Sequence, residues 1–284
     1  MSGGISKGEE IFIREGIEDD VRQDGRSRMD YRDFSLQTDV LAQTNGSARL
    51  ELGSSRVLVG VKLEIGTPDP NTPNWGILKT SVEWCKASAS RAGERIDREL
   101  TTASLSRRLE RALIPAPGSN KGGIDLGSLC IIPGQQCWIV YVDTLILGDG
   151  GNLIDAISLG TRAALRNTKI PKINLVPGEL DGEMEFELSD DPLDCTRLEM
   201  HNIPICVSLT KIGNYYVIDP SAEEESCMSM QLTVAVDKDG NFCSMSKSGK
   251  GAIDPSGMIE MLQSVKKIGQ ALLQKIDKIL SERE

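Results

Sequence analysis

Apolar and polar positions along the chain predict two series of strands, each followed by a helix. Trp138–Leu147 is rich in β-branched and aromatic residues and is predicted to be a buried strand, and Val57–Val61 a second interior strand. A helical pattern of apolar residues follows from Leu153 onwards. The strands expected nearer the C-terminus are Ile205–Leu209, Tyr215–Ile218, Leu232–Val236 and Phe242–Met245. The pattern therefore indicates the α+β class.

The last helix has the clearest boundaries. Asp254 is a good N-cap residue, Pro255 suits the first helical position, and an apolar stripe then continues to Ile279. An earlier helix is expected within the basic segment Arg91–Arg111, because its apolar residues have helical spacing. These residues are Leu105, Leu109, Ala112 and Leu113. Asp237–Gly240 is predicted to be the hairpin turn between the last two strands.

Changes in composition divide the chain into four parts. Residues 1–30 form an N-terminal segment that begins with an amphipathic stretch, and residues 31–170 form a first half. Residues 171–195 are rich in Gly, Glu and Asp and are predicted to be a hinge-like connection. Residues 196–284 form a second half that ends in the long helix.

Bulk composition is that of an ordinary soluble globular protein. The 284 residues are 39% apolar and 26% charged. No apolar run approaches the roughly 18 residues of a membrane helix, and the N-terminus lacks the pattern of a secretory signal. We therefore expect no membrane partner.

Cysteine, histidine and charge each exclude a class of site. The seven cysteines include no C-x-x-C pair, which favours reduced core thiols in an intracellular protein and argues against zinc. Any His-dependent catalytic triad would need His201, the only histidine, which is instead expected in a turn or at a strand entry. The net charge of −10 argues against a general nucleic-acid coat, although it leaves a local basic groove possible.

A glycine-rich turn separates the central strand from its helix and has the form of a phosphate site. The turn is Gly148-Asp149-Gly150-Gly151-Asn152. A turn of this kind offers free backbone N–H groups and the positive end of a helix dipole, which suit an anion. No cation follows, because Asn152, Leu153 and Ile154 cannot neutralise phosphate charge. The sequence therefore predicts the backbone of a phosphate site without its charged side chain.

Several motifs in order resemble the RNase PH family of 3′→5′ phosphorolytic ribonucleases over nearly the whole chain. They are Arg22-Gln23-Asp24-Gly25-Arg26, Gly46-Ser47-Ala48, the strand that ends in Gly150-Gly151, and Lys247-Ser248-Gly249-Lys250-Gly251. The resemblance implies an RNase PH-like fold of two βαβα-type halves, similar to the second domain of ribosomal protein S5.

Within that family, three further motifs resemble ring subunits of the RNA exosome. They are Gly150-Gly151-Asn152, Ser189–Pro192, and Val217–Pro220 followed by Glu223–Ser226. The resemblance implies other RNase PH-like subunits as partners in a six-membered ring, S1/KH cap subunits above it, and single-stranded RNA in its pore. It also implies rRNA maturation and mRNA turnover in nucleus, nucleolus and cytoplasm, with no cofactor.

Two departures from the family pattern bear on catalysis. Active members carry Thr-Arg or Ser-Arg after the paired glycines, where Gly150 and Gly151 are here followed by Asn152 and Leu153. Asp219 matches the first of their acidic residues, but the second would fall near Ser229–Gln231, which has no carboxylate. The resemblance thus implies a subunit that is not itself an enzyme.

The alternative is an active phosphate-dependent 3′→5′ exoribonuclease, alone or through a composite site with a partner subunit. Its phosphate ligand would come from another position, such as Arg95 or Arg98.

Charged clusters leave further alternatives open. The resemblance implies RNA contact by Arg107, Arg108 or Arg111, whereas an ordinary solvated helix face would pair them with Glu110 and its neighbours. The motif Arg22–Arg26 is expected to hold the N-terminal segment in place through a turn and ion pairs. The acidic run Glu223–Glu225 is expected to be a solvated loop rather than a metal site.

Overall fold

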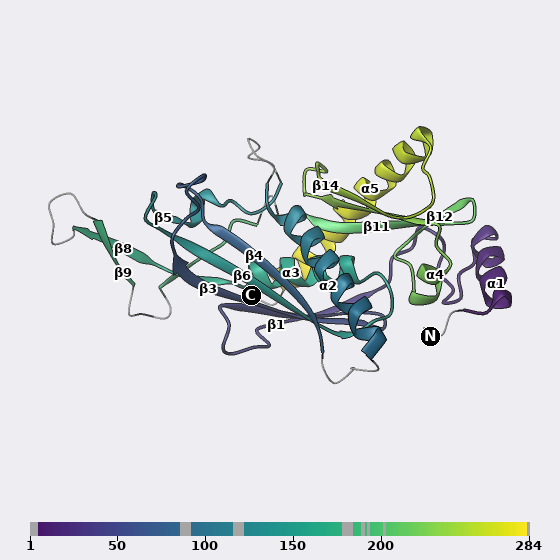
Figure 1. The fold of residues 1–284 in the computed structure, drawn as a ribbon, viewed down its shortest axis with the longest axis horizontal. Coiled ribbons are helices and arrows are strands. Elements are labelled where there is room, and N and C mark those ends of the chain that lie inside the picture. Colours follow the sequence, from purple (N-terminus) through teal and green to yellow (C-terminus); the bar gives the residue numbers. More distant parts are fainter. Residues whose placement is uncertain are drawn as a thin grey trace.

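The computed structural model of the chain describes residues 5–85, 92–115, 122–177, 184–188, 191, 194–200 and 203–282. The predicted α+β class is confirmed. The fold contains two large sheets, with helices between them and one long helix on the outer face of the second sheet (Figure 1). His201, most of the run Ser189–Pro192 and the side chain of Arg95 lie outside the described residues.

The first sheet has the strand order β1-β2-β3-β6-β4, with β5 paired to β6. Its strands pair antiparallel except β4 and β6, which are parallel. Alternate residues of each strand face the helices, and these are the β-branched and leucine positions that the hydrophobic pattern marks. The strands are β1 (Phe34–Thr38), β2 (Gly46–Leu52), β3 (Ser55–Gly66), β4 (Ile77–Trp84), β5 (Cys130–Ile132) and β6 (Gln136–Gly148).

The second sheet has the order β12-β11-β13-β14 and is antiparallel throughout. The backbone N–H of Gly240 donates to the carbonyl of Asp237 at 3.1 Å, which confirms the predicted turn between the last two strands. The strands are β11 (Ile205–Ile212), β12 (Tyr215–Ile218), β13 (Met230–Val236) and β14 (Phe242–Gly249).

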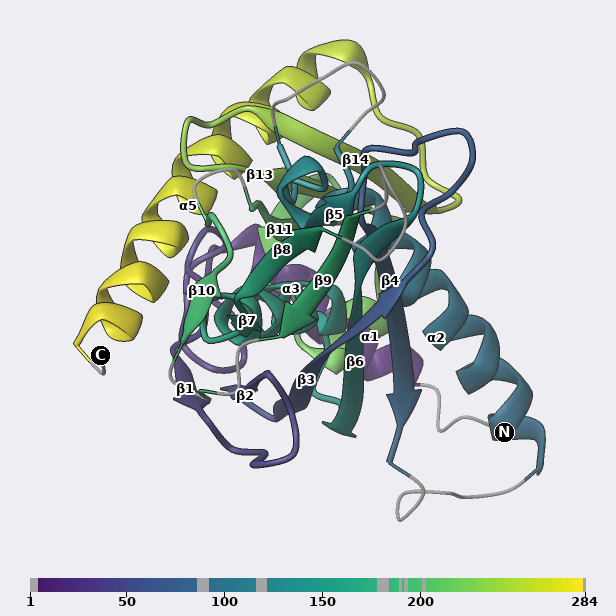
Figure 2. The same cartoon turned by 90° about the vertical axis from the view of Figure 1, so that its left-hand side faces the viewer.

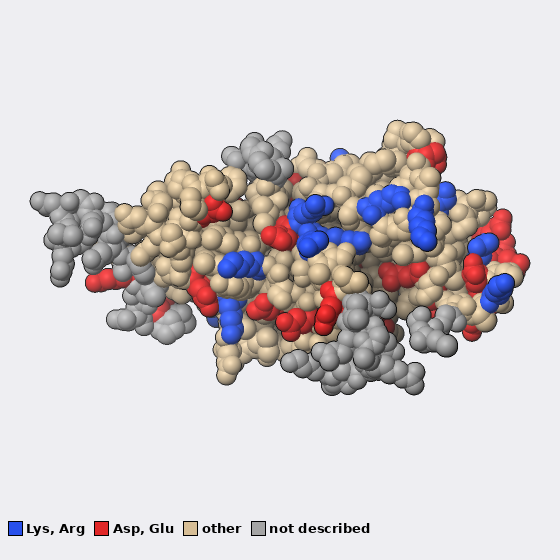
Figure 3. Space-filling model, in the orientation of Figure 1, with Lys and Arg blue, Asp and Glu red and all other residues tan. Residues whose placement is uncertain are grey.

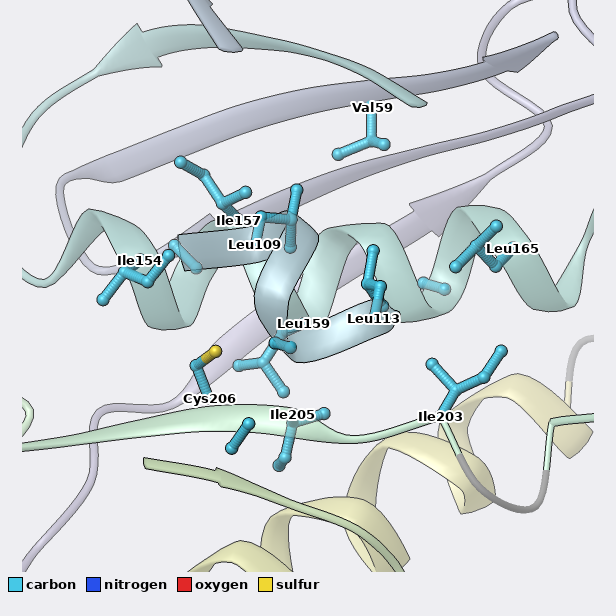
Figure 4. Packing of buried hydrophobic residues seen from close by; sticks show 14 of the residues in the cluster. Val59, Leu109, Leu113, Ile154, Ile157, Leu159, Leu165, Ile203, Ile205 and Cys206 are labelled. Atoms are coloured by element: carbon cyan, nitrogen blue, oxygen red, sulfur yellow. The ribbon is translucent and has the colours of Figure 1, made fainter. Parts of the chain in front are cut away.

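Helix α3 (Leu153–Arg166) lies between the two sheets and is buried along its length from Leu153 to Leu165 (Figure 4). It packs on β2 and β3 on one side and on β11 on the other, so that one hydrophobic core spans both halves. A Cβ atom at Gly160 would lie 3.2 Å from Val59, which shows how closely the helix approaches the first sheet.

Two longer helices flank this core on opposite sides (Figure 2). Helix α2 (Ala92–Leu113) covers β4 and contacts α3 and β14, and it buries the four apolar residues that the sequence pattern selects. Helix α5 (Pro255–Ser281) covers the outer face of the second sheet. The side chain of Asp254 accepts a hydrogen bond from the N–H of Gly257, so the predicted N-cap is confirmed.

The N-terminal helix α1 (Lys7–Glu18) lies at one end of the molecule (Figure 1). Ser6 and Glu9 form a capping box at its start, and Ile13 and Ile17 pack on β12 in a small cluster separate from the main core. The short helix α4 (Ala222–Ser226) follows β12.

The described part of residues 171–195, predicted to be a hinge-like connection, contains paired strands. Strand β7 (Lys169–Pro171) pairs with β10 (Cys195–Arg197), and β8 (Ile173–Pro177) pairs with β9 (Met184–Leu188) in a hairpin at the other end of the molecule (Figure 1). Antiparallel pairing satisfies the backbone groups of a polar segment, which its composition alone does not reveal. The boundaries of the two halves stay a prediction.

All seven cysteines are free, but only Cys137 and Cys206 are buried, so the expected core location holds for those two. Among the described residues, no helix is both long and apolar enough to cross a membrane.

Candidate phosphate site and basic surface

The glycine turn between β6 and α3 is packed tightly on both sides. A Cβ atom at Gly150 would lie 2.6 Å from Ser54, and one at Gly151 would lie 2.5 Å from the backbone of Ala222. Gly151 also has a φ of +85°, in the region that favours glycine. The hydroxyl of Ser55 accepts from the N–H of Gly150 at 3.0 Å and donates to the carbonyl of Gly151 at 2.6 Å. The two glycines therefore serve close packing against the start of β3 and α4.

Three backbone N–H groups of the turn, those of residues 150–152, are not free, contrary to the sequence-based expectation. That of Gly150 donates to Ser55, that of Gly151 to the Asp149 carboxylate at 3.1 Å, and that of Asn152 to Glu225 Oε1 at 2.9 Å. Glu225 also accepts from Gln231 Nε2 at 3.2 Å. A carboxylate of the chain thus occupies the anion position at the start of α3. Burial raises the pKa of Glu225, although the Asn152 N–H opposes the shift.

A cation from a distant part of the chain lies against the turn. Arg32 Nη1 donates to the carbonyl of Gly150 at 3.0 Å, and Nη2 donates to that of Gly151 at 3.2 Å. The charge is already neutralised, because Arg32 Nε and Nη2 each lie 2.8 Å from an oxygen of Asp219. Sequence reasoning missed Arg32 because it precedes the turn by more than a hundred residues and belongs to no motif.

Asn152 and Leu153, the two residues that follow the paired glycines, make contacts only within the interior of the chain. Asn152 is fully buried, and its Nδ2 donates to Asp219 at 2.7 Å and to Asp155 at 2.9 Å. The side chain of Leu153 packs in the hydrophobic core. Asn152 therefore joins two carboxylates of its own chain.

Asp155 is a second fully buried carboxylate of this network. It accepts hydrogen bonds from the N–H of Ser208 at 2.9 Å, from its hydroxyl at 2.7 Å and from the Tyr31 hydroxyl at 3.1 Å. Burial raises the pKa of Asp155 to about 7, against the effect of its hydrogen bonds from Asn152 and Ser208. Burial acts in the same direction on Asp219, but its bonds to Arg32 outweigh it and lower the pKa.

The motif Arg22–Arg26 holds the N-terminal segment in place, as expected. The buried guanidinium of Arg22 binds both oxygens of Glu224 and donates to the carbonyl of Ile218 at 3.0 Å. Arg26 lies 2.7 Å from Asp24 and 3.2 Å from Asp219. These contacts fix the segment against the loop after β12.

The expectation of a solvated acidic loop at Glu223–Glu225 is wrong. The residues form helix α4, in which Glu224 is buried against Arg22 and Glu225 binds the turn before α3. The partners of Glu224 and Glu225 are Arg22 and the Asn152 N–H, which are distant in sequence. The run of acids by itself therefore does not predict these contacts. In the described part of the chain, no three acidic, Cys or His residues are grouped as metal ligands.

The arginines predicted to contact RNA lie at the C-terminal half of α2. Arg107 and Arg111 are exposed, and Arg108 is half-buried. Within the described residues, none of the three forms an ion pair, and the alternative pairing with Glu110 is not seen. The structure leaves their charges available to a ligand.

This basic surface continues onto β14, which the sequence analysis did not anticipate. Lys247 on β14 and Lys250 just after it are exposed, and α2 packs beside that strand. Figure 3 shows Lys and Arg side chains gathered on one face over the C-terminal half of α2 and the neighbouring second sheet. Lys247 and Lys250 belong to a motif noted in the sequence, but only the fold brings that motif beside α2.

Arg98, proposed above as an alternative phosphate ligand, stacks on an aromatic ring. Its guanidinium carbon lies 5.0 Å from the centroid of the Trp84 ring, and the side chain is half-buried.

Family models match both halves of the chain. Domain 1 of the 3′ exoribonuclease family matches residues 30–171, and domain 2 of the same family matches residues 202–267. The chain belongs to the 3′ exoribonuclease family. The resemblance to the RNase PH family, first indicated by short motifs, is thereby confirmed.

Relatives at full length are exosome proteins by name. The chain is 37% identical to the putative exosome complex exonuclease RRP42 of Dictyostelium discoideum, over 98% of each protein. It is 35% identical to the exosome complex component Rrp42 of Methanocella arvoryzae, over 91% of each.

Solved structures of this family share the fold. An archaeal exosome core subunit is 31% identical with a TM-score of 0.73, covering 95% of this chain and 96% of its own. A chain from the Archaeoglobus fulgidus exosome with RNA bound to the active site is 32% identical with a TM-score of 0.74, covering 94% and 97%.

Proposed function

We propose that this chain is an RNase PH-like ring subunit of the exosome that does not itself catalyse phosphorolysis. Similarity over almost the whole length to proteins named exosome complex component Rrp42 supports the ring role. The fold shared with archaeal exosome cores supports other RNase PH-like subunits as its neighbours.

One observation carries the non-catalytic assignment: the anion position at the start of α3 holds the chain's own Glu225. Phosphorolysis needs inorganic phosphate held in line with the scissile bond, with its charge offset as the transition state forms. Here the three N–H groups of the turn have partners, and Arg32 is committed to Asp219. A phosphate would have to displace a carboxylate and break a bidentate ion pair.

The proposed role in RNA handling rests on the basic surface of Arg107, Arg108, Arg111, Lys247 and Lys250. Cations suitably placed in a channel can contact phosphates without any catalytic chemistry. We include in the proposal S1/KH cap subunits as partners, RNA processing that covers rRNA maturation and mRNA turnover, and a location in nucleus, nucleolus and cytoplasm. The names of the relatives support the exosome context of these roles.

The second candidate is an active exoribonuclease, alone or through a composite site with a partner. The presence of Arg32 at the glycine turn favours it, as does the word exonuclease in the name of the Dictyostelium relative. Release of Arg32 from Asp219 would be its first requirement.

The deciding experiment is phosphorolysis of a short single-stranded RNA by the purified chain, with and without inorganic phosphate. We expect no nucleoside diphosphates in either condition. Their appearance only with phosphate would refute the non-catalytic assignment. Repeating the assay with the chain bound to an RNase PH-like partner separates a composite site from an independent one. In that case Arg107→Glu should slow shortening by the pair, while the chain alone stays inactive.

A further inference from the structure

The outer side of α1 and the turn that follows it expose large apolar side chains. Ile13 and Ile17 are 4% and 1% exposed and hold the helix on β12, whereas Ile11 and Phe12 are 55% and 65% exposed. Val21, in the turn that follows, is 62% exposed. Large apolar side chains that cluster at a surface mark sites of interaction.

Phe12 and Val21 border a preformed hollow. Phe12, Gly16, Ile17 and Val21 line a space of about 320 Å³ between the end of α1 and the turn. The N–H of Val21 donates to the carbonyl of Gly16 at 2.8 Å, and a Cβ atom at Gly16 would lie 2.7 Å from the Val21 carbonyl oxygen. The buried Arg22–Glu224 ion pair fixes the base of the turn. A hollow held in place by such contacts loses little conformational entropy when a ligand binds to it.

The rim of the hollow is acidic. Between Ile5 and Val21 the chain has six acidic residues and two basic ones, Lys7 and Arg14. Two of the acids, Glu15 and Asp19, line the hollow itself. Figure 3 shows Asp and Glu side chains gathered at the end of the molecule where α1 lies, away from the basic surface over α2.

We propose that α1 and the turn after it form a docking surface for a protein segment with an apolar side chain flanked by lysine or arginine. The apolar side chain enters the hollow beside Phe12 and Val21, and its basic neighbours pair with Glu15 and Asp19. Charge disfavours RNA, which would bring phosphates to an acidic rim, and a symmetric contact with a second copy, which would bring the same acids together.

The test is an unbiased selection of peptides from a random library displayed on phage, with the full-length chain as target. The enriched peptides are then measured by fluorescence anisotropy against the chain and its variants. We expect a consensus of one large apolar residue flanked by Lys or Arg, with affinity that falls as salt rises. In the double variant Phe12→Ser/Val21→Ser the affinity should fall at least tenfold, and Glu15→Lys/Asp19→Lys should weaken binding and reduce its salt dependence.

Phe242→Ser is the matched control, because Phe242 is 43% exposed on β14 and its loss should not alter peptide affinity. Circular dichroism of each variant should match the parent, since every substituted side chain is at the surface. Enrichment of acidic peptides, no enrichment at all, or equal affinity for the Phe12/Val21 variant would overturn the proposal. A dimer of the parent chain that this variant dissolves would instead assign the surface to a second copy. None of these results depends on phosphorolysis. The docking surface can therefore be refuted while the proposed function stands, and the proposed function can be refuted while the docking surface stands.

Discussion

Replacing Arg22 with methionine removes the cation of a buried ion pair and keeps most of the side-chain volume. The side chains of Arg22 and Glu224 are 0% and 5% exposed, so Glu224 would be left buried without a partner. Three carbonyls, those of Asp30, Ile218 and Asp219, would also lose a donor. Removal of one partner of a buried pair typically costs about 3–5 kcal/mol. We expect Arg22→Met to lie in that range.

Urea unfolding of the full-length chain, followed by circular dichroism, measures this cost. With an m-value of about 3 kcal/mol/M, a loss of about 4 kcal/mol lowers the midpoint by about 1.3 M. Arg28→Met is the matched control, because the Arg28–Asp20 pair is 27% and 47% exposed and should contribute no more than about 1 kcal/mol.

The double variant Arg22→Met/Glu224→Leu tests the physical reason. It leaves no stranded charge, so it should recover a large part of the stability that Arg22→Met loses. If the double variant is no more stable than Arg22→Met, the cost does not come from an unpaired Glu224. A midpoint for Arg22→Met equal to that of Arg28→Met would refute the assignment of the ion pair as the anchor of the N-terminal segment.

Three other predictions concern the same network and the basic surface. The pKa of Asp155 is raised from 3.8 to about 7 on folding, so its contribution to stability is present below 3.8 and is lost as pH rises to about 7. The unfolding free energy of Asp155→Asn minus that of the parent should therefore rise over this interval, and a flat difference would contradict the shift. Gly151→Ala should cost about 2–4 kcal/mol, because its Cβ atom meets backbone at positive φ. Gly25→Ala, also at positive φ but with open space, should cost clearly less in the same urea titration. Arg107→Glu should weaken binding of single-stranded RNA in fluorescence anisotropy. It should also reduce the slope of log binding constant against log salt concentration by about 0.7 or more, whereas Lys267→Glu on α5 should change neither quantity. Equal effects of the two substitutions would mean that α2 is not the RNA surface.

Local patterns determined most of the secondary structure. The turn at Asp237–Gly240 and the N-cap at Asp254 were predicted correctly because the residues that form them lie within a few positions of one another. The strand Trp138–Leu147 and the stripe of α5 were predicted because burial repeats with the period of each element. Family membership also followed from short motifs, since their order along the chain is itself sequence information.

Only the tertiary structure determined which charged groups contact the glycine turn. The glycine turn at residues 150–152 was predicted from the sequence, but Arg32 and Glu225 reach it from distant positions and supply a cation and an anion. Within the polar segment 171–195, residues 173–177 and 184–188 likewise form paired strands through partners in the fold. Hydrogen bonds and ion pairs depend on atoms lying about 3 Å apart in space, and spacing along the chain carries no record of such contacts between remote segments.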